Sequence, residues 1–66
     1  MTVNVLIEGN LKDGERDGFT EICREAFKVT RAFDGCKHID LVYNTEDGNH
    51  WFFNETWESK AQYDKY

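Results

Sequence analysis

The segment HWFFNETW, residues 50–57, most constrains the fold, because it carries large side chains at both its odd and its even positions. Successive side chains of a β-strand point to opposite faces, so two sets of four residues face opposite sides: Trp51, Phe53, Glu55 and Trp57, and His50, Phe52, Asn54 and Thr56. A strand with apolar groups on both faces is usually covered on both sides. We therefore expect cover on each face of this strand.

The length of the chain limits how that cover can be supplied. With 66 residues the chain has room for one domain, spanning 1–66, and a domain of this size buries only roughly 60% of its unfolded surface. Aromatic residues make up 15% of the sequence, which lets few side chains bury much area. Small scaffolds commonly need a disulfide, a metal or a partner chain in addition.

The N-terminal half predicts a strand followed by a helix. Val3, Val5 and Ile7 alternate, which indicates a strand over residues 3–11. Asp13 is a candidate helix cap, because its carboxylate can accept from the free N–H groups of a first turn. A helix over residues 15–32 is predicted from an apolar stripe at helical spacing: Phe19, Ile22, Cys23, Ala26, Phe27 and Thr30.

The C-terminal half predicts two strands and a second helix. Residues 36–43 show Ile39, Leu41 and Tyr43 on one strand face, and a loop with Asp47-Gly48 joins them to residues 50–57. Ser59 and Gln62 form a capping box at the start of a short helix.

The predicted order, β-α-β-β-α, is that of an α+β, ferredoxin-like split βαβ fold without its fourth strand. The first strand is then an exposed edge. Either the chain is a fragment of a longer one, truncated at its C-terminus, or a partner supplies the cover.

Charge and cysteine content argue against several function classes. The net charge is −5 and the basic residues are scattered, which argues against nucleic-acid binding. No secretory signal and no membrane span is recognised, so we expect a cytoplasmic protein with no membrane partner. Cys23 and Cys36 are the two cysteines, and we expect two packed free thiols, with a disulfide as the alternative.

Two segments resemble the antibiotic biosynthesis monooxygenase (ABM) family. TRAFDGC precedes the second strand, where members usually read Glu-Gly-Cys, and WFFNETWESKAQYDKY spans the third strand and second helix. Glu55, Trp57, Glu58 and Ser59 match the family pattern Glu-x-Trp-Glu-Ser. The resemblance covers nearly all of the chain.

The resemblance implies a ferredoxin-like fold that forms a homodimer through its sheet faces, a dimeric α/β barrel. It also implies a cofactor-independent monooxygenase that oxidises an aromatic phenol or quinol with O2, using no metal, flavin or haem. The chemical logic is that an ionised phenol is already a good electron donor, so the protein binds the ring and stabilises the anion.

Carried over residue by residue, the resemblance is mixed. Trp57 matches the tryptophan at the strand end, and Tyr63 matches a tyrosine six residues later in one polyketide-oxidising branch. The asparagine four residues before the tryptophan is Phe53 here, while Asn54 lies one residue away and so on the opposite strand face. A histidine found nine residues after the tryptophan in many members is Tyr66.

We therefore predict that Trp57, Tyr63 and Phe53 bind a flat aromatic ligand, with three polar catalytic candidates: Asn54, His38 and His50. Histidine suits general base chemistry because its ordinary pKa lies near neutrality. Cys36, His38 and Asp40 alternate on one strand face, but their spacing fits no zinc pattern, and no metal is expected. The alternative function is a non-catalytic α/β-barrel module that binds a small ligand or only dimerises.

Overall fold

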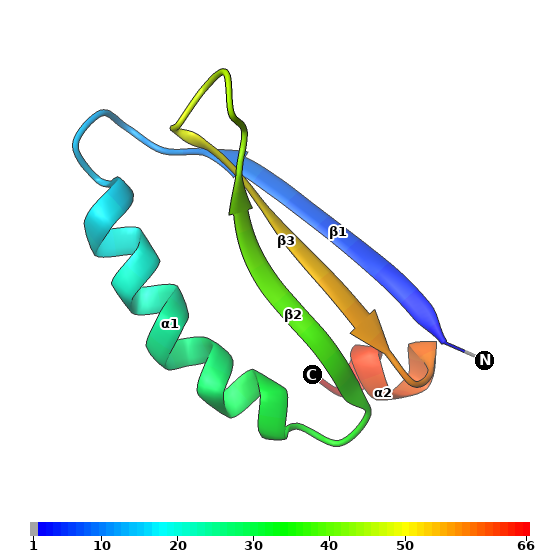
Figure 1. The fold of residues 1–66 in the computed structure, drawn as a ribbon. Helices are drawn as coiled ribbons and strands as arrows, with labels where there is room; N and C mark the ends of the chain where they lie inside the picture. Colours follow the sequence, from blue (N-terminus) through cyan, green and yellow to red (C-terminus); the bar gives the residue numbers. More distant parts are fainter. Residues whose placement is uncertain (1) are drawn as a thin grey trace.

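The computed structural model describes residues 2–66, which form five elements (Figure 1). These are β1 (Val3–Asn10), α1 (Arg16–Ala32), β2 (Cys36–Tyr43), β3 (His50–Trp57) and α2 (Lys60–Lys65). The order β-α-β-β-α and the α+β, ferredoxin-like class confirm the prediction, and β2 and β3 have the predicted bounds. No helix within residues 2–66 has the length and apolar character needed to cross a membrane.

The three strands form one antiparallel sheet in the order β1-β3-β2. The strand with large side chains on both faces is therefore the central one. β1 pairs with β3 from Val3 opposite Trp57 to Asn10 opposite His50. β2 pairs with β3 from Tyr43 opposite Trp51, and its register shifts between Cys36 and His38.

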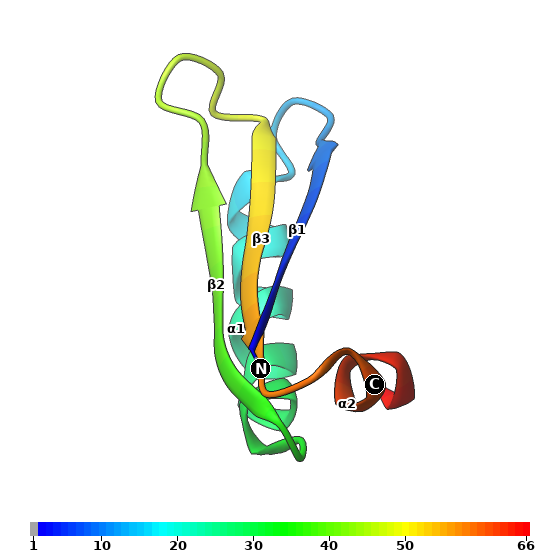
Figure 2. The ribbon, with the colours of Figure 1, turned by 90° about the vertical axis from the view of Figure 1, so that its right-hand side faces the viewer.

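One face of the sheet is packed against α1, and we call it the helix-facing side (Figures 1 and 2). The buried cluster at this interface consists of Cys23 and Phe27 from the helix and Ile39 from β2. Leu41 and Phe53 are partly buried against it, as the period-two pattern predicted.

The other face of the sheet carries the even-numbered residues of β3 and is not covered by a helix; we call it the open face (Figure 2). It includes Phe52, Leu6 of β1 and Val42 of β2, of which Leu6 is 64% exposed and Val42 43%. The predicted cover for this face is therefore absent from residues 2–66.

The start of α1 differs from the prediction in two ways. Glu15 occupies the N-cap without a side-chain capping bond, so Asp13 is not the cap. Gly14 has a φ of 84°, a left-handed conformation that turns the chain between Asp13 and the helix. The Asp13 carboxylate faces the β2–β3 loop, where it accepts a hydrogen bond of 2.6 Å from Asn49 Nδ2. Ile22, predicted in the buried stripe, is 69% exposed because the helix covers β2 and β3 and leaves that flank open.

The second helix begins as predicted. Ser59 Oγ accepts from the Gln62 backbone N–H at 3.2 Å and donates to Gln62 Oε1 at 2.9 Å. Gln62 Nε2 also donates to Asp34 at 3.2 Å, which ties α2 to the turn before β2. Both views place α2 beside the start of β1 (Figures 1 and 2).

Both cysteines are free thiols, as predicted. Cys23 lies in the core and Cys36 is half-buried at the start of β2. Burial raises the pKa of each thiol above its ordinary value.

Candidate functional site

An aromatic cluster fills one end of the helix-facing side. The ring of Phe19 on α1 lies 5.1 Å from Trp51 and 6.1 Å from Phe53, and it stacks nearly parallel to Phe53. Trp51 and Phe53 are themselves 4.6 Å apart, and Phe27 meets Phe53 edge-on at 5.1 Å. These centroid distances are typical of stabilising aromatic pairs.

Trp51 keeps its place because β1 has a glycine opposite it. A Cβ atom on Gly9 would lie 2.5 Å from Trp51 Cζ2, which is well inside van der Waals contact. The absence of a side chain at Gly9 thus lets the indole lie against the backbone of β1.

A second aromatic group surrounds Trp57 at the far end of β3. Trp57 is fully buried, with ring centroids of Phe33, Tyr63 and Tyr66 at 5.9, 5.7 and 5.1 Å. Its Nε1–H donates to Glu55 Oε1 at 2.9 Å, and Glu55 is only 2% exposed. The indole donor is therefore satisfied inside the chain, and Trp57 serves as a core residue.

The sheet separates the predicted site residues into two groups. Phe53, Trp57 and Tyr63 lie on the helix-facing side, because Phe53 packs on Phe19 and Tyr63 on Trp57. The other three residues, the polar candidates, point to the open face: Asn54, His38 and His50. The predicted arrangement of an aromatic frame with one of these polar groups beside it is therefore not formed within one chain.

Each histidine is engaged with a carboxylate on the open face. His38 Nε2 lies 2.6 Å from Asp40 Oδ2, and His50 Nε2 lies 3.0 Å from Glu8 Oε1. The prediction that Cys36 shares this face with His38 and Asp40 is wrong. The register shift after Cys36 turns its side chain toward the core. Within residues 2–66 no group of three or more metal-ligating side chains is assembled.

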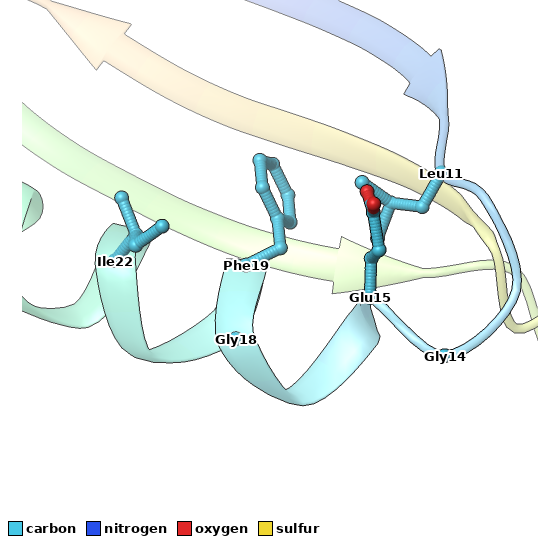
Figure 3. Close-up of a pocket in the computed structure, with 6 residues that line it drawn as sticks. All are labelled: Leu11, Gly14, Glu15, Gly18, Phe19 and Ile22. Carbon is cyan, nitrogen blue, oxygen red and sulfur yellow. The ribbon is translucent and has the colours of Figure 1, made fainter.

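A cavity of about 290 Å³ lies beside the first turns of α1 (Figure 3). The cavity is lined by the residue that follows β1 and by residues just before and along the first turns of α1: Leu11, Gly14, Glu15, Gly18, Phe19 and Ile22. Figure 3 shows Glu15, Phe19 and Ile22 projecting from the helix on the side of the sheet. The sequence patterns do not predict this site, although Gly14 and Gly18 flank the predicted helix start and Ile22 belongs to the predicted apolar stripe.

A second cavity, of about 230 Å³, lies on the opposite flank of α1, beside β2. It is lined by mixed polar and apolar residues: Thr20, Cys23, Arg24, Phe27, Arg31, Asp40, Leu41 and Tyr43. Arg31 is held there by a 3.1 Å hydrogen bond to the Ile39 carbonyl. None of the six predicted site residues lines either cavity.

Comparison with known proteins identifies the fold and the family. The solved structure of Rv0793 from Mycobacterium tuberculosis is similar, with a TM-score of 0.82 and 23% sequence identity. The match covers 97% of this chain and 64% of that chain, so the present sequence spans less than two thirds of its structural relative. No curated protein sequence matches the chain. A model of the antibiotic biosynthesis monooxygenase family matches residues 2–66, and the chain belongs to that family.

Proposed function

We propose that the chain binds a small aromatic compound in the cavity between Leu11 and the first turns of α1. The observation that carries this proposal is the 290 Å³ space beside the Phe19 ring, next to an apolar surface that the chain itself leaves uncovered. Ile22 is 69% exposed there, and Ile7 on the helix-facing side of β1 is 38% exposed. Ligand sites are commonly apolar concavities with a few polar groups, and this cavity has that character.

The predicted ligand residues fit this proposal in different ways. Phe53 supports the cavity wall from behind, since its ring stacks on Phe19. Trp57 and Tyr63 pack against each other at the other end of the helix-facing side, and neither residue lines the cavity. We therefore assign the ligand to the Phe19 end of the helix-facing side and a structural role to Trp57.

Oxidation of the bound compound by O2, without a metal or organic cofactor, is the second candidate function. Membership of the family over residues 2–66 favours it. For an anthrone-type phenol, one atom of O2 becomes a new carbonyl oxygen and the other leaves as water, with the electrons coming from the substrate. The reaction needs the ring to be held and a proton removed, and Glu15 is the ionisable side chain in the cavity lining.

Binding is tested by titrating the purified protein with 2-naphthol, following chemical shifts of backbone amides by NMR. We expect the Ile22→Lys variant to lose binding, because it puts a charge at the cavity wall. Val29→Lys is the matched control, since Val29 is 71% exposed on the same helix and does not line the cavity. Unchanged affinity in Ile22→Lys would refute this placement of the site.

Catalysis is tested with the same variants in an oxygen electrode, using anthrone and quinol substrates without added metal or flavin. Uptake above the uncatalysed rate that is lost in Ile22→Lys and kept in Val29→Lys would support a monooxygenase. Binding of these compounds without uptake would support the non-catalytic ligand-binding module.

We also propose that a second copy of the chain covers the open face. Membership of the antibiotic biosynthesis monooxygenase family favours a dimer, and Leu6, Phe52 and Val42 form an apolar patch across the three strands of this face. In such a dimer Asn54, His38 and His50 lie at the interface. Light scattering is expected to give a dimer mass for the wild type and a monomer mass for Phe52→Glu. A monomeric wild type at micromolar concentration would contradict the proposal.

A further inference from the structure

Both histidines of the chain point to the open face, and each has a carboxylate as its partner there. His50 on β3 reaches Glu8 on β1 at 3.0 Å, and His38 reaches Asp40 on its own strand at 2.6 Å. Neither histidine lines a cavity or belongs to the buried core cluster. Histidine side chains change charge near neutral pH, so these two pairs make the charge of the open face depend on pH.

The strand register places the two pairs beside the apolar patch of this face. Glu8 lies directly opposite Phe52, and Phe52 lies directly opposite Val42. The His50 ring also packs against Phe52, with the ring centroids 4.6 Å apart. Asp40 precedes Val42 by two residues on the same strand face. A molecule that covers the apolar patch therefore also covers both carboxylates.

No lysine or arginine lies on this face among the described residues of the three strands. The residues that point to it are polar, apolar or acidic apart from the two histidines: Asn4, Leu6, Glu8, Asn10, His38, Asp40, Val42, His50, Phe52, Asn54 and Thr56. Charged groups at the ends of the strands have other partners: Asp13 and Asp47 with Asn49, and Lys37 with Glu58. The helix α1 packs against the opposite face. On the open face, only the histidines can neutralise the two carboxylates.

We propose that docking of a second copy on the open face depends on pH, and that protonation of His38 and His50 strengthens it. This inference rests on the proposed dimer. When the histidines are neutral, Glu8 and Asp40 bring two uncompensated negative charges from each copy to an apolar interface. Burying a charge without an opposite charge is costly, and like charges across an interface repel. Protonated histidines turn both pairs into ion pairs of no net charge, so dimer formation takes up protons.

The direction of the pH dependence follows from this uptake. Since the dimer binds more protons than two separate monomers, its dissociation constant falls as the pH falls through the histidine range, from about pH 8 to about pH 5.5. We expect the dissociation constant to be at least about tenfold lower at pH 5.5 than at pH 8. That factor corresponds to about 1.4 kcal/mol, shared by the ion pairs of both copies.

Sedimentation equilibrium of the purified chain measures the dissociation constant at pH 5.5, 7 and 8, in about 150 mM salt to screen long-range repulsion. The double variant His38→Gln, His50→Gln should lose the pH dependence and dimerise at pH 5.5 as weakly as the wild type at pH 8. The double variant Glu8→Gln, Asp40→Asn should dimerise more tightly than the wild type at pH 8. Its pH dependence should be reversed, because the protonated histidines then repel each other across the interface.

A matched control separates this effect from the general loss of negative charge at low pH. Glu21→Gln with Glu25→Gln removes the same two charges from the exposed surface of α1, where they pair with Arg24 and Lys28. It should keep the pH dependence of the wild type. Phe52→Glu should remain monomeric at pH 5.5, which would place the pH-dependent contact on the open face.

The outcomes separate this inference from the proposed dimer. A dimer with the same dissociation constant at pH 5.5 and pH 8 overturns the inference and leaves the dimer in place. A pH dependence that persists without the two histidines, or in Phe52→Glu, overturns it as well. A wild type that stays monomeric at every pH, with its fold confirmed by circular dichroism, overturns the proposed dimer itself.

Discussion

Replacing Trp57 with phenylalanine keeps an aromatic ring in the core and removes one hydrogen-bond donor. The lost donor is Nε1–H, which lies 2.9 Å from Glu55 Oε1, with both side chains at most 2% exposed. Leaving a buried acceptor without its partner costs about 1–3 kcal/mol. The smaller ring adds about 1 kcal/mol for lost packing. We therefore expect Trp57→Phe to lower the free energy of unfolding by about 2–4 kcal/mol.

That loss is large for this chain, because a domain of 66 residues has a total stability of roughly 3–10 kcal/mol. Urea denaturation measures it, with the fluorescence of Trp51 as the remaining reporter. The double variant Trp57→Phe with Glu55→Leu should recover part of the loss, since an apolar pair leaves no unmet hydrogen bond. A change below about 0.5 kcal/mol in Trp57→Phe, or no recovery in the double variant, would refute the role given to this hydrogen bond.

Three further predictions concern the packing of the sheet and the core thiols. Gly9→Ala should lower the free energy of unfolding by about 1–3 kcal/mol, because its Cβ would lie 2.5 Å from Trp51; a thermal melt equal to the wild type would contradict this. Gly35→Ala should cost about 1–2 kcal/mol in urea denaturation, since φ is 91° there, and a neutral effect would show that the turn relaxes freely. Burial raises the pKa of Cys23 above 9.0, so the unfolded thiol ionises first as pH rises. The free energy of unfolding should thus fall as pH rises above 9.0 toward the folded pKa, and Cys23→Ala should flatten that slope; an unchanged slope would refute it.

The sequence alone was sufficient for the elements whose pattern is local. Residues 36–43 and 50–57 alternate between turn-forming loops, so their bounds as β2 and β3 are the predicted ones. The Ser59 cap was equally predictable, because a capping box is formed within four residues.

Features that depend on tertiary contacts were not predictable in this way. The exposure of Ile22 depends on which strands α1 covers, and helical spacing does not contain that information. The register shift after Cys36 arises only when β2 pairs with β3, so strand parity alone put Cys36 on the wrong face. The cavity is missed for the same reason, since Leu11 meets Gly18 and Ile22 only in the folded chain.

The placement of β3 between β1 and β2 has a consequence for the order in which the sheet can assemble. β2 and β3 are joined by the six residues 44–49, whereas pairing β1 with β3 closes a loop of the 39 residues 11–49 between Asn10 and His50. The longer closure costs about 2 kcal/mol more in chain entropy. During synthesis β1 is made first and has no neighbour in the sheet until β3 follows. The helix and the β2–β3 hairpin can form from local contacts, while the strand that leaves the ribosome earliest is the last to gain a partner.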